Sequence, residues 1–276
     1  MEATKYELAQ IKEAALQNNN SDWQELAFSC IDLTTLNSTD TVSHVKAFTE
    51  RVNDFENDYP NLPNVAAICV HPNMVRTVKE NLKDDHVNIA AVAGGFPGSM
   101  SFIEVKVKEA RMAVDYGADE IDIVLPLWAF LDNDDIICRE EITTIKEAIG
   151  EAHLKVILET GALADSEKIR HASMLAMESG ADFIKTSTGK MSPAATPDAA
   201  LEMCITIKDY HRKTGKKIGF KPAGGISTTE DAILYLTIVS EVLGEEWLKP
   251  SLFRIGASRL ANNLLSDLLD EKIKYF

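Results

Sequence analysis

Two lysines stand near the ends of short apolar runs, where a charged side chain is unexpected. Lys185 closes the stretch Asp182–Lys185, and Lys221 closes Lys217–Lys221. Two ammonium groups that face one pocket repel each other, and burial adds a desolvation cost, so both effects lower a lysine pKa. A lysine tuned towards neutrality can attack a carbonyl and form a Schiff base. The pair therefore predicts imine chemistry at Lys185.

Acidic residues accompany these lysines. Asp122 lies between Ile121 and Ile123, and Asp32 ends an apolar run. Asp122 would supply the carboxylate for proton transfer at the carbinolamine and enamine stages. The alternative is a purely structural ion pair inside the fold, such as Lys155 with Glu159.

Three loops have the composition of anion-binding turns: Thr186–Lys190, Gly224–Ser227 and Gly256–Ser258. Glycines allow backbone N–H groups to approach phosphate oxygens, and the N-terminus of a following helix adds a positive dipole. Gly189-Lys190 does not complete a Walker A motif, because Ile184 and Met191 occupy its defining positions. A single Gly-Gly pair is more often a simple turn. Only the three loops together therefore support the prediction of a phosphate site.

The elements that would position these residues recur along the chain as a β-branched run, a loop and an amphipathic stretch. Parallel strands buried on both faces have this apolar character. Eight runs, spaced by about 30 residues as in βα units, are Ala27–Asp32, Val65–Val70, Val87–Ala93, Glu120–Leu125, Leu154–Glu159, Phe183–Thr186, Lys217–Lys221 and Leu252–Gly256. Eight units favour a closed α/β barrel, the (β/α)₈ or TIM barrel, over a doubly wound open sheet. Catalytic groups of such barrels project from the C-terminal ends of the strands.

The helical stretches between the runs have recognisable ends. Phe102–Tyr116 stops before Gly117, Ser166–Ser179 follows the N-cap candidate Asp165, and Pro197–Tyr210 follows Thr196. We expect a single domain, with residues 1–26 as an N-terminal helical extension, 27–262 as the barrel and 263–276 as a C-terminal helix or tail.

The chain of 276 residues has a formal net charge of −15, which argues against a nucleic-acid partner. No apolar stretch is long enough to span a membrane, and the N-terminus lacks the features of a signal peptide. The four cysteines form no CxxC pair, which favours reduced thiols in the cytoplasm. No His, Cys and carboxylate residues have metal-ligand spacing, so we expect neither a metal nor a cofactor.

The run Gly180–Gly189 strongly resembles the Schiff-base segment of the 2-deoxy-D-ribose-5-phosphate aldolase family. Three further runs resemble that family in the same order: Ile31–Leu36, Gly117–Asp122 and Gly219–Gly225. The similarity extends from about residue 25 to about residue 262. It implies a metal-free class I aldolase that reversibly cleaves 2-deoxy-D-ribose 5-phosphate to acetaldehyde and D-glyceraldehyde 3-phosphate, and that works as a homodimer or a larger homo-oligomer.

The resemblance also assigns roles. Lys185 is the Schiff-base lysine, Lys221 perturbs it and helps to move protons, Asp122 is the acid/base residue, and Asp32 supports the relay or orients a substrate hydroxyl. The matching phosphate-binding positions are Gly189, Lys190, Gly224, Gly225 and Ser258. Possible pocket residues are Cys69, Thr34 and Thr186. Cys69 matches a cysteine that aldehyde products can attack, with a small buried hydrophobe as the alternative.

Three positions depart from the family pattern or carry over insecurely. Arg259 replaces the second serine of a phosphate-binding pair, and we expect its side chain to turn inward to the phosphate. His71 stands where a tyrosine is familiar. Tyr275 is next to last, whereas in some relatives a C-terminal tyrosine reaches the site, so a frayed terminus is the alternative.

Other functions remain open from the sequence alone. A transaldolase-like enzyme on the same barrel would use the same lysine with a ketose donor. A phosphate-binding isomerase or an inactive barrel would need no lysine pair.

Overall fold

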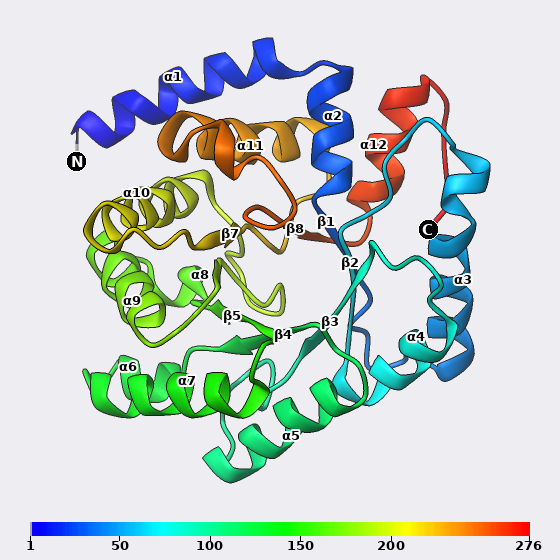
Figure 1. Cartoon of the computed structure of the whole chain (residues 1–276). Helices are drawn as coiled ribbons and strands as arrows, with labels where there is room; N and C mark the ends of the chain where they lie inside the picture. Colours follow the sequence, from blue (N-terminus) through cyan, green and yellow to red (C-terminus); the bar gives the residue numbers. More distant parts are fainter. Residues whose placement is uncertain (1) are drawn as a thin grey trace.

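Eight parallel strands form a barrel that is surrounded by helices (Figure 1). The computed structural model describes residues 2–276 and, from Leu8 onward, their side chains. The strands are β1 (Ile31–Thr34), β2 (Ala67–Val70), β3 (Asn88–Val92), β4 (Glu120–Val124), β5 (His153–Ile157), β6 (Phe183–Lys185), β7 (Gly219–Lys221) and β8 (Ile255–Ala257). Their order is β7-β6-β5-β4-β3-β2-β1-β8, and all neighbours are parallel. The barrel closes between β7 and the segment leading into β8, where the Phe220 N–H donates to the Leu252 carbonyl at 3.0 Å. The (β/α)₈ barrel is confirmed.

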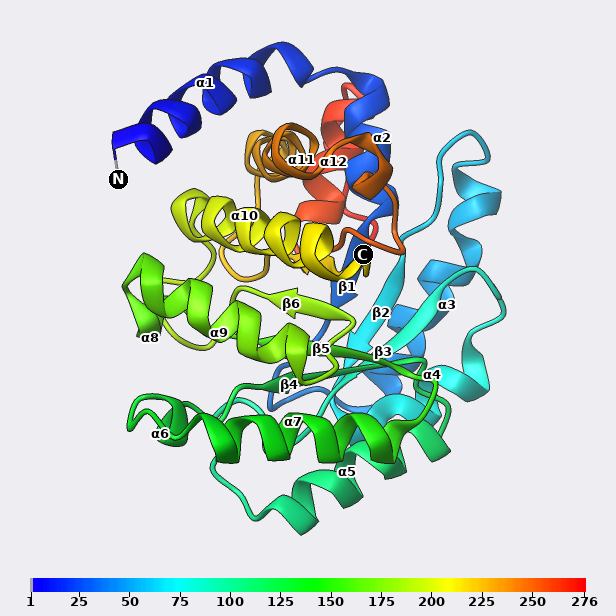
Figure 2. The same cartoon turned by 60° about the vertical axis from the view of Figure 1, so that its left-hand side comes forward.

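Each strand is followed by helical structure, and two helices precede β1. The α-helices are α1 (Glu2–Asn18), α2 (Ser21–Ser29), α3 (Val42–Asp58), α4 (Val75–Asn81), α5 (Ile103–Asp115), α6 (Leu127–Phe130), α7 (Asp135–Ile149), α8 (Thr160–Leu163), α9 (Ser166–Glu178), α10 (Pro197–Thr214), α11 (Thr229–Leu243) and α12 (Leu260–Leu269). Two short 3₁₀ helices are η1 (Pro72–Met74) and η2 (Glu245–Trp247). The expected caps form, because Asp165 and Thr196 accept backbone N–H groups at the starts of α9 and α10. Helix α1 lies outside the ring of helices, against α11 and α10 (Figures 1 and 2).

Several strand boundaries differ from the sequence prediction. Ala27 lies in α2, so β1 begins only at Ile31. Strand β5 ends at Ile157, and Glu159 follows it in the left-handed backbone region, with φ +53°. Strands β6 and β7 each contain three residues. A buried apolar run marks a strand, but hydrogen bonding to the neighbouring strands sets its ends.

The interior of the barrel is divided into an apolar and a charged part. Successive side chains of a strand point to opposite faces, so every second residue faces inward. Strands β2 and β3 contribute a small cluster of Ala67, Cys69, Ala90 and Val92, covered by Leu36 and Phe96. Strands β1, β4, β5, β6 and β7 place buried charged residues in the interior, and Arg254, directly before β8, adds one more. The larger hydrophobic core lies between the strands and the helices.

Candidate active site

Lys185 and Lys221 are neighbours at the C-terminal ends of β6 and β7. They are register partners, so their side chains point to the same face of the sheet, which is the barrel interior. Gly256 makes room for the second lysine, because a Cβ atom there would lie 3.1 Å from Cε of Lys221. The fold therefore brings together the two lysines that the sequence singles out.

Asp122 of β4 joins the two amines. Its Oδ2 accepts hydrogen bonds from Lys185 Nζ at 2.9 Å and from Lys221 Nζ at 2.8 Å. Its Oδ1 accepts from Lys155 Nζ at 3.1 Å. The carboxylate is fully buried, so it has no solvent to replace these partners.

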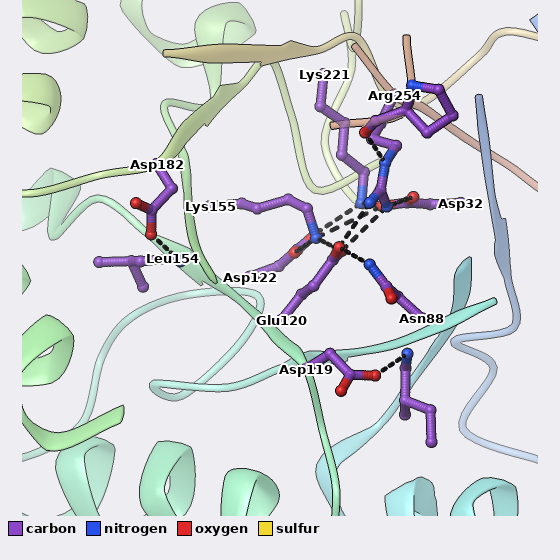
Figure 3. A network of polar contacts seen from close by, with 12 residues as sticks. Asp32, Asn88, Asp119, Glu120, Asp122, Leu154, Lys155, Asp182, Lys221 and Arg254 are labelled. Carbon is purple, nitrogen blue, oxygen red and sulfur yellow. Dashed lines mark hydrogen bonds and ion pairs between the residues drawn. The ribbon is translucent and has the colours of Figure 1, made fainter. Parts of the chain in front are cut away.

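Below Asp122, a network of charged side chains fills the barrel (Figure 3). Arg254 donates to Asp32 Oδ1 and to Glu120 Oε1, each at 2.6 Å. Lys155 donates to Glu120, and Lys221 donates to Asp32. Lys155 thus pairs with Glu120 and Asp122, not with Glu159 as the structural alternative supposes. The alternative pair of Lys155 with Glu159 does not form, because Glu159 follows β5 in a left-handed turn and its carboxylate contacts Thr188.

The charges of this network nearly cancel. Asp32, Glu120 and Asp122 face Lys155, Lys221 and Arg254, which leaves Lys185 as the additional basic group. A buried cluster with excess positive charge is destabilised, and loss of one proton from Lys185 restores the balance. The arrangement therefore favours a neutral amine at Lys185.

The pKa shifts of the lysines follow from these surroundings. Burial, aided by repulsion from Lys221, lowers the pKa of Lys185 in spite of Asp122. Burial also acts on Lys221, but attraction by Asp122 and Asp32 outweighs it and raises that pKa. The expectation that both lysines are lowered is therefore wrong for Lys221. The sequence does not reveal that this lysine faces two carboxylates.

The carboxylates remain ionised for the complementary reason. Burial alone would raise the pKa of Asp122, but Lys155, Lys185 and Lys221 together hold it well below its usual range. The pKa values of Asp32 and Glu120 are lowered in the same way by their basic partners.

A cavity of about 240 Å³ opens above Lys185. Its lining includes the expected phosphate positions Gly189, Lys190, Gly224, Gly225, Ser258 and Arg259, together with Thr34 and Thr188. Among the residues that the structure describes, the N–H groups of Gly189, Gly224, Gly225 and Ser258 have no acceptor. Helices α11 and α12 begin beside these loops, with N-caps at Thr228 and Arg259. The cavity thus combines open amides, two helix N-termini and two basic side chains, which suits an anion.

Three other candidates lie away from the cavity lining. Cys69 is fully buried on β2, and burial raises its pKa. Thr186 is buried, with its hydroxyl donating to the Ala223 carbonyl at 3.1 Å. Tyr275 donates to Asp58 Oδ2 at 2.7 Å and packs against Phe55 on the flank of the barrel. Its backbone N–H donates to Asn262 Oδ1 on α12, so the tyrosine packs on this flank and does not reach Lys185.

Arg254 and Glu120 are not among the site residues expected from the sequence, although they complete the network. Both lie in predicted strands of otherwise apolar residues. The criterion that singles out Lys185, a charged residue within an apolar run, would therefore have identified them as well. Within residues 2–276, no group of three or more His, Cys, Asp or Glu side chains is placed to hold a metal ion. The same residues contain no helix long and apolar enough to cross a membrane.

The sequence matches the model of a known family, described as DeoC/LacD family aldolase, over residues 26–240. The chain belongs to this aldolase family. It is 42% identical to the deoxyribose-phosphate aldolases of Homo sapiens, over 252 residues, and of Bos taurus, over 248 residues. These alignments cover 88% and 86% of this chain and 79% and 78% of the relatives, respectively.

Solved structures of aldolases share the fold. One described as "QR15, an Aldolase" has 29% identity and a TM-score of 0.72, covering 88% of this chain and 96% of its own. The deoxyribose phosphate aldolase of Aeropyrum pernix has 24% identity and a TM-score of 0.70, covering 93% and 96%. This DeoC/LacD aldolase is therefore a lyase with a (β/α)₈ barrel, and in its structure Lys185 and Lys221 lie at the C-terminal ends of β6 and β7.

Proposed function

We propose that the chain reversibly cleaves 2-deoxy-D-ribose 5-phosphate to acetaldehyde and D-glyceraldehyde 3-phosphate through a Schiff base on Lys185. One observation carries the assignment of the lysine. Among the described residues, three lysines contact Asp122, and of these Lys185 alone lines the cavity. It is also the one whose pKa is lowered, so it is the amine best able to attack a carbonyl.

The reaction begins when neutral Lys185 attacks the aldehyde carbon C1 of the open-chain sugar. The carbinolamine loses water to give the imine, and Asp122 and Lys221 exchange protons with it, because Asp122 Oδ2 contacts the Lys185 nitrogen and Lys221 donates to the same oxygen. Asp122 then takes the proton of the C3 hydroxyl while the C2–C3 bond breaks. D-Glyceraldehyde 3-phosphate leaves, and the electron pair of the broken bond is held as an enamine on Lys185. Protonation of C2 and hydrolysis of the imine release acetaldehyde.

The phosphate group would bind at the opposite side of the cavity. The open amides of Gly189, Gly224, Gly225 and Ser258 support this assignment. Arg259 lines the same cavity, which supports the inward orientation expected from the sequence. Asp32 would act as a positioning group, because it binds Lys221 and Arg254 beneath the cavity and is fully buried.

Borohydride reduction in the presence of acetaldehyde tests the proposal. The expected result is one ethylated lysine, found by peptide mass spectrometry at Lys185 and absent in Lys185→Ala, which should stay folded but lose activity by several orders of magnitude. Ethylation at Lys221 or Lys155 would exclude the assignment. Release of acetaldehyde from 2-deoxyribose 5-phosphate distinguishes this reaction from transaldolase chemistry, and an isomerase would give no adduct.

We further propose that the enzyme is a cytoplasmic homo-oligomer. The Aeropyrum pernix relative is described as tetrameric. All four cysteines are buried free thiols, which suits a reducing compartment. Cell fractionation tests the location, and the mass in solution tests the assembly.

A further inference from the structure

Glu159 is a buried carboxylate that the reaction scheme does not use. It follows β5, is 3% exposed and has φ +53° and ψ 58°, a left-handed conformation that is costly for a glutamate. The structure gives it no ion-pair partner among the described residues. A buried acid in a strained backbone, without a cation, requires another explanation.

Both oxygens of Glu159 are instead occupied by one residue, Thr188. Oε2 accepts the Thr188 hydroxyl at 2.6 Å, and Oε1 accepts the Thr188 N–H at 3.2 Å. This two-point contact sets both the rotamer and the backbone orientation of Thr188. The left-handed turn at Glu159 directs the carboxylate towards the loop between β6 and α10.

Thr188 in turn shapes the tip of that loop. Because its hydroxyl hydrogen points to Glu159, its oxygen is free to accept the Lys190 N–H at 3.0 Å. Gly189, with φ +74°, lies between these two residues and exposes its N–H group at the cavity. Lys190 Nζ reaches across the mouth to the Leu36 carbonyl at 2.6 Å. The conformation of the anion-binding tip therefore depends on the proton orientation that Glu159 imposes.

The same turn holds the loop at two other points. The Thr160 N–H donates to the Thr186 carbonyl at 2.9 Å, and a Cβ atom on Gly161 would lie 1.9 Å from the Pro193 carbonyl oxygen. Loss of the Glu159 carboxylate should thus loosen the tip of the loop without releasing its ends. The Lys185 amine contacts Asp122 and not Glu159, so the reacting group is separate from this contact.

We propose that Glu159 is a positioning residue that orients the loop Thr186–Lys190 for the phosphate of the substrate and so determines the preference for phosphorylated over unphosphorylated sugar. This inference rests on the proposed function, because it assumes that a phosphate binds at the loop.

Glu159→Gln tests the proposal while preserving the size of the side chain. Thr188 offers two donors, and a glutamine amide has only one acceptor oxygen, so either one Thr188 donor loses its acceptor or the Thr188 hydroxyl turns its hydrogen away and accepts from the amide instead. We expect KM for 2-deoxyribose 5-phosphate to rise about tenfold, with kcat changed less than about threefold. The kinetic constants for unphosphorylated 2-deoxyribose and the inhibition by inorganic phosphate provide the comparison. The inhibition should weaken by a similar factor, whereas cleavage of 2-deoxyribose should stay unchanged.

Four further variants, one of them a control, show whether the effect acts through Thr188. Glu167→Gln makes the same chemical change on the exposed first turn of α9 and should alter nothing. Thr188→Val should reproduce the Glu159→Gln effect, and Thr188→Ser should restore most of the phosphate preference. Because the two residues form one contact, the double variant Glu159→Gln/Thr188→Val should be no worse than either single variant.

The outcomes separate this inference from the proposed function. If the wild-type enzyme prefers the phosphorylated sugar and Glu159→Gln keeps that preference, the role of Glu159 is refuted and the proposed function stands. Equal losses for both sugars would also refute it, because they indicate a general structural role. Should Glu159→Gln not fold, equal losses of the phosphate preference in Thr188→Val and Thr188→Ser, that is, no rescue by serine, would count against the proposal. A wild-type enzyme that cleaves both sugars equally well would refute the role of Glu159 and leave the proposed function standing, whereas one that cleaves neither would refute the proposed function.

Discussion

At the scale of single residues, the decisive feature is that one carboxylate serves several amines. Asp122 Oδ2 contacts Lys185 and Lys221 at nearly equal distances, 2.9 and 2.8 Å. Lys221 also binds Asp32, which keeps it protonated, whereas Lys185 has Asp122 alone. Lys221 contacts two carboxylates and Lys185 contacts one, so the pKa of Lys221 is raised while that of Lys185 is lowered. In the proposed reaction, this difference distinguishes Lys185, which attacks, from Lys221, which supplies protons.

Removal of Lys221 should therefore change the pH profile in a definite direction. Activity requires the neutral Lys185 amine, so it increases as the pH rises through that pKa. Lys221→Leu removes a positive charge that repels the Lys185 ammonium group. Asp122 then interacts only with Lys185 and Lys155, and both effects raise the Lys185 pKa. The acid limb of the plot of kcat/KM against pH should shift to higher pH, measured with saturating coupling enzymes.

Lys213→Leu is a suitable control for that shift. Lys213 is on α10 with its side chain 71% exposed and pairs loosely with Glu178 at 3.8 Å. Its loss should leave the acid limb in place. An unchanged acid limb in Lys221→Leu would mean that Lys221 does not set the Lys185 pKa.

At the scale of elements, the strands hold the inward-facing side chains at successive levels along the barrel. Phe183 and Lys185 on β6 face inward at two levels, and the absence of a side chain at Gly219 leaves room for the Phe183 ring, which a Cβ atom would meet at 2.2 Å. The lower level contains Arg254, whose guanidinium lies over the Phe183 ring at 5.9 Å. Arg254, in the segment through which β7 and β8 close the barrel, also links Asp32 on β1 to Glu120 on β4. The charged network therefore joins strands that share no backbone hydrogen bonds.

Arg254→Met should accordingly destabilise the barrel. Removal of one partner from a buried ion-pair network typically costs about 3–5 kcal/mol. The free energy of unfolding, measured by urea denaturation at pH 7, should fall by about 3 kcal/mol. Arg76→Met, which breaks the exposed Arg76–Glu80 pair at 2.9 Å, should cost less than about 1 kcal/mol.

The pH dependence of this loss provides a second check. The folded-state pKa values of Asp32 and Glu120 are lowered, so their contribution is present above the unfolded-state pKa and is lost as the pH falls. Without Arg254 the pKa values of Asp32 and Glu120 are lowered less. The difference between wild type and Arg254→Met should thus be largest near neutral pH and shrink below about pH 4. A difference that stays constant across this range would exclude an electrostatic origin.

At the scale of the whole molecule, several large apolar side chains remain on the surface at one rim. Phe102 is 80% exposed at the N-cap of α5, and Ile136 is 69% exposed in the first turn of α7. The two helices pack side by side, and both begin after the C-terminal ends of their strands (Figure 1). Exposed apolar residues gathered in this way mark contact surfaces more often than chance.

We expect a second copy of the chain to cover this rim in the proposed homo-oligomer. Light scattering coupled to gel filtration should give a mass of two or more chains, and Phe102→Asp should shift the population towards the monomer. Leu16→Asp, at a 76% exposed position on α1, should leave the mass unchanged. A wild-type monomer at micromolar concentration would contradict the oligomer, and an unaffected mass in Phe102→Asp would place the interface elsewhere.

The sequence by itself determined the order of the eight strands and the identity of the lysines. Apolar runs are local signals, and a charge within such a run, as at Lys185 or Asp122, is conspicuous because burial makes it costly. The glycine-rich loops are equally local, since their residues lie within a few positions of each other. These features follow from the chain alone because they depend on the type and spacing of neighbouring residues.

Only the tertiary structure decided how the charges are paired. Lys221 and Asp32 are separated by 189 positions, and Arg254 and Asp32 by 222, so their contacts depend on barrel closure and strand register. The pKa of Lys221 rises because of these contacts, and no local pattern reveals them. The same holds for Glu159, which follows β5 instead of ending it and reaches Thr188 through a left-handed turn. Register and backbone handedness are properties of packed strands, and they decide which neighbour a charged side chain meets.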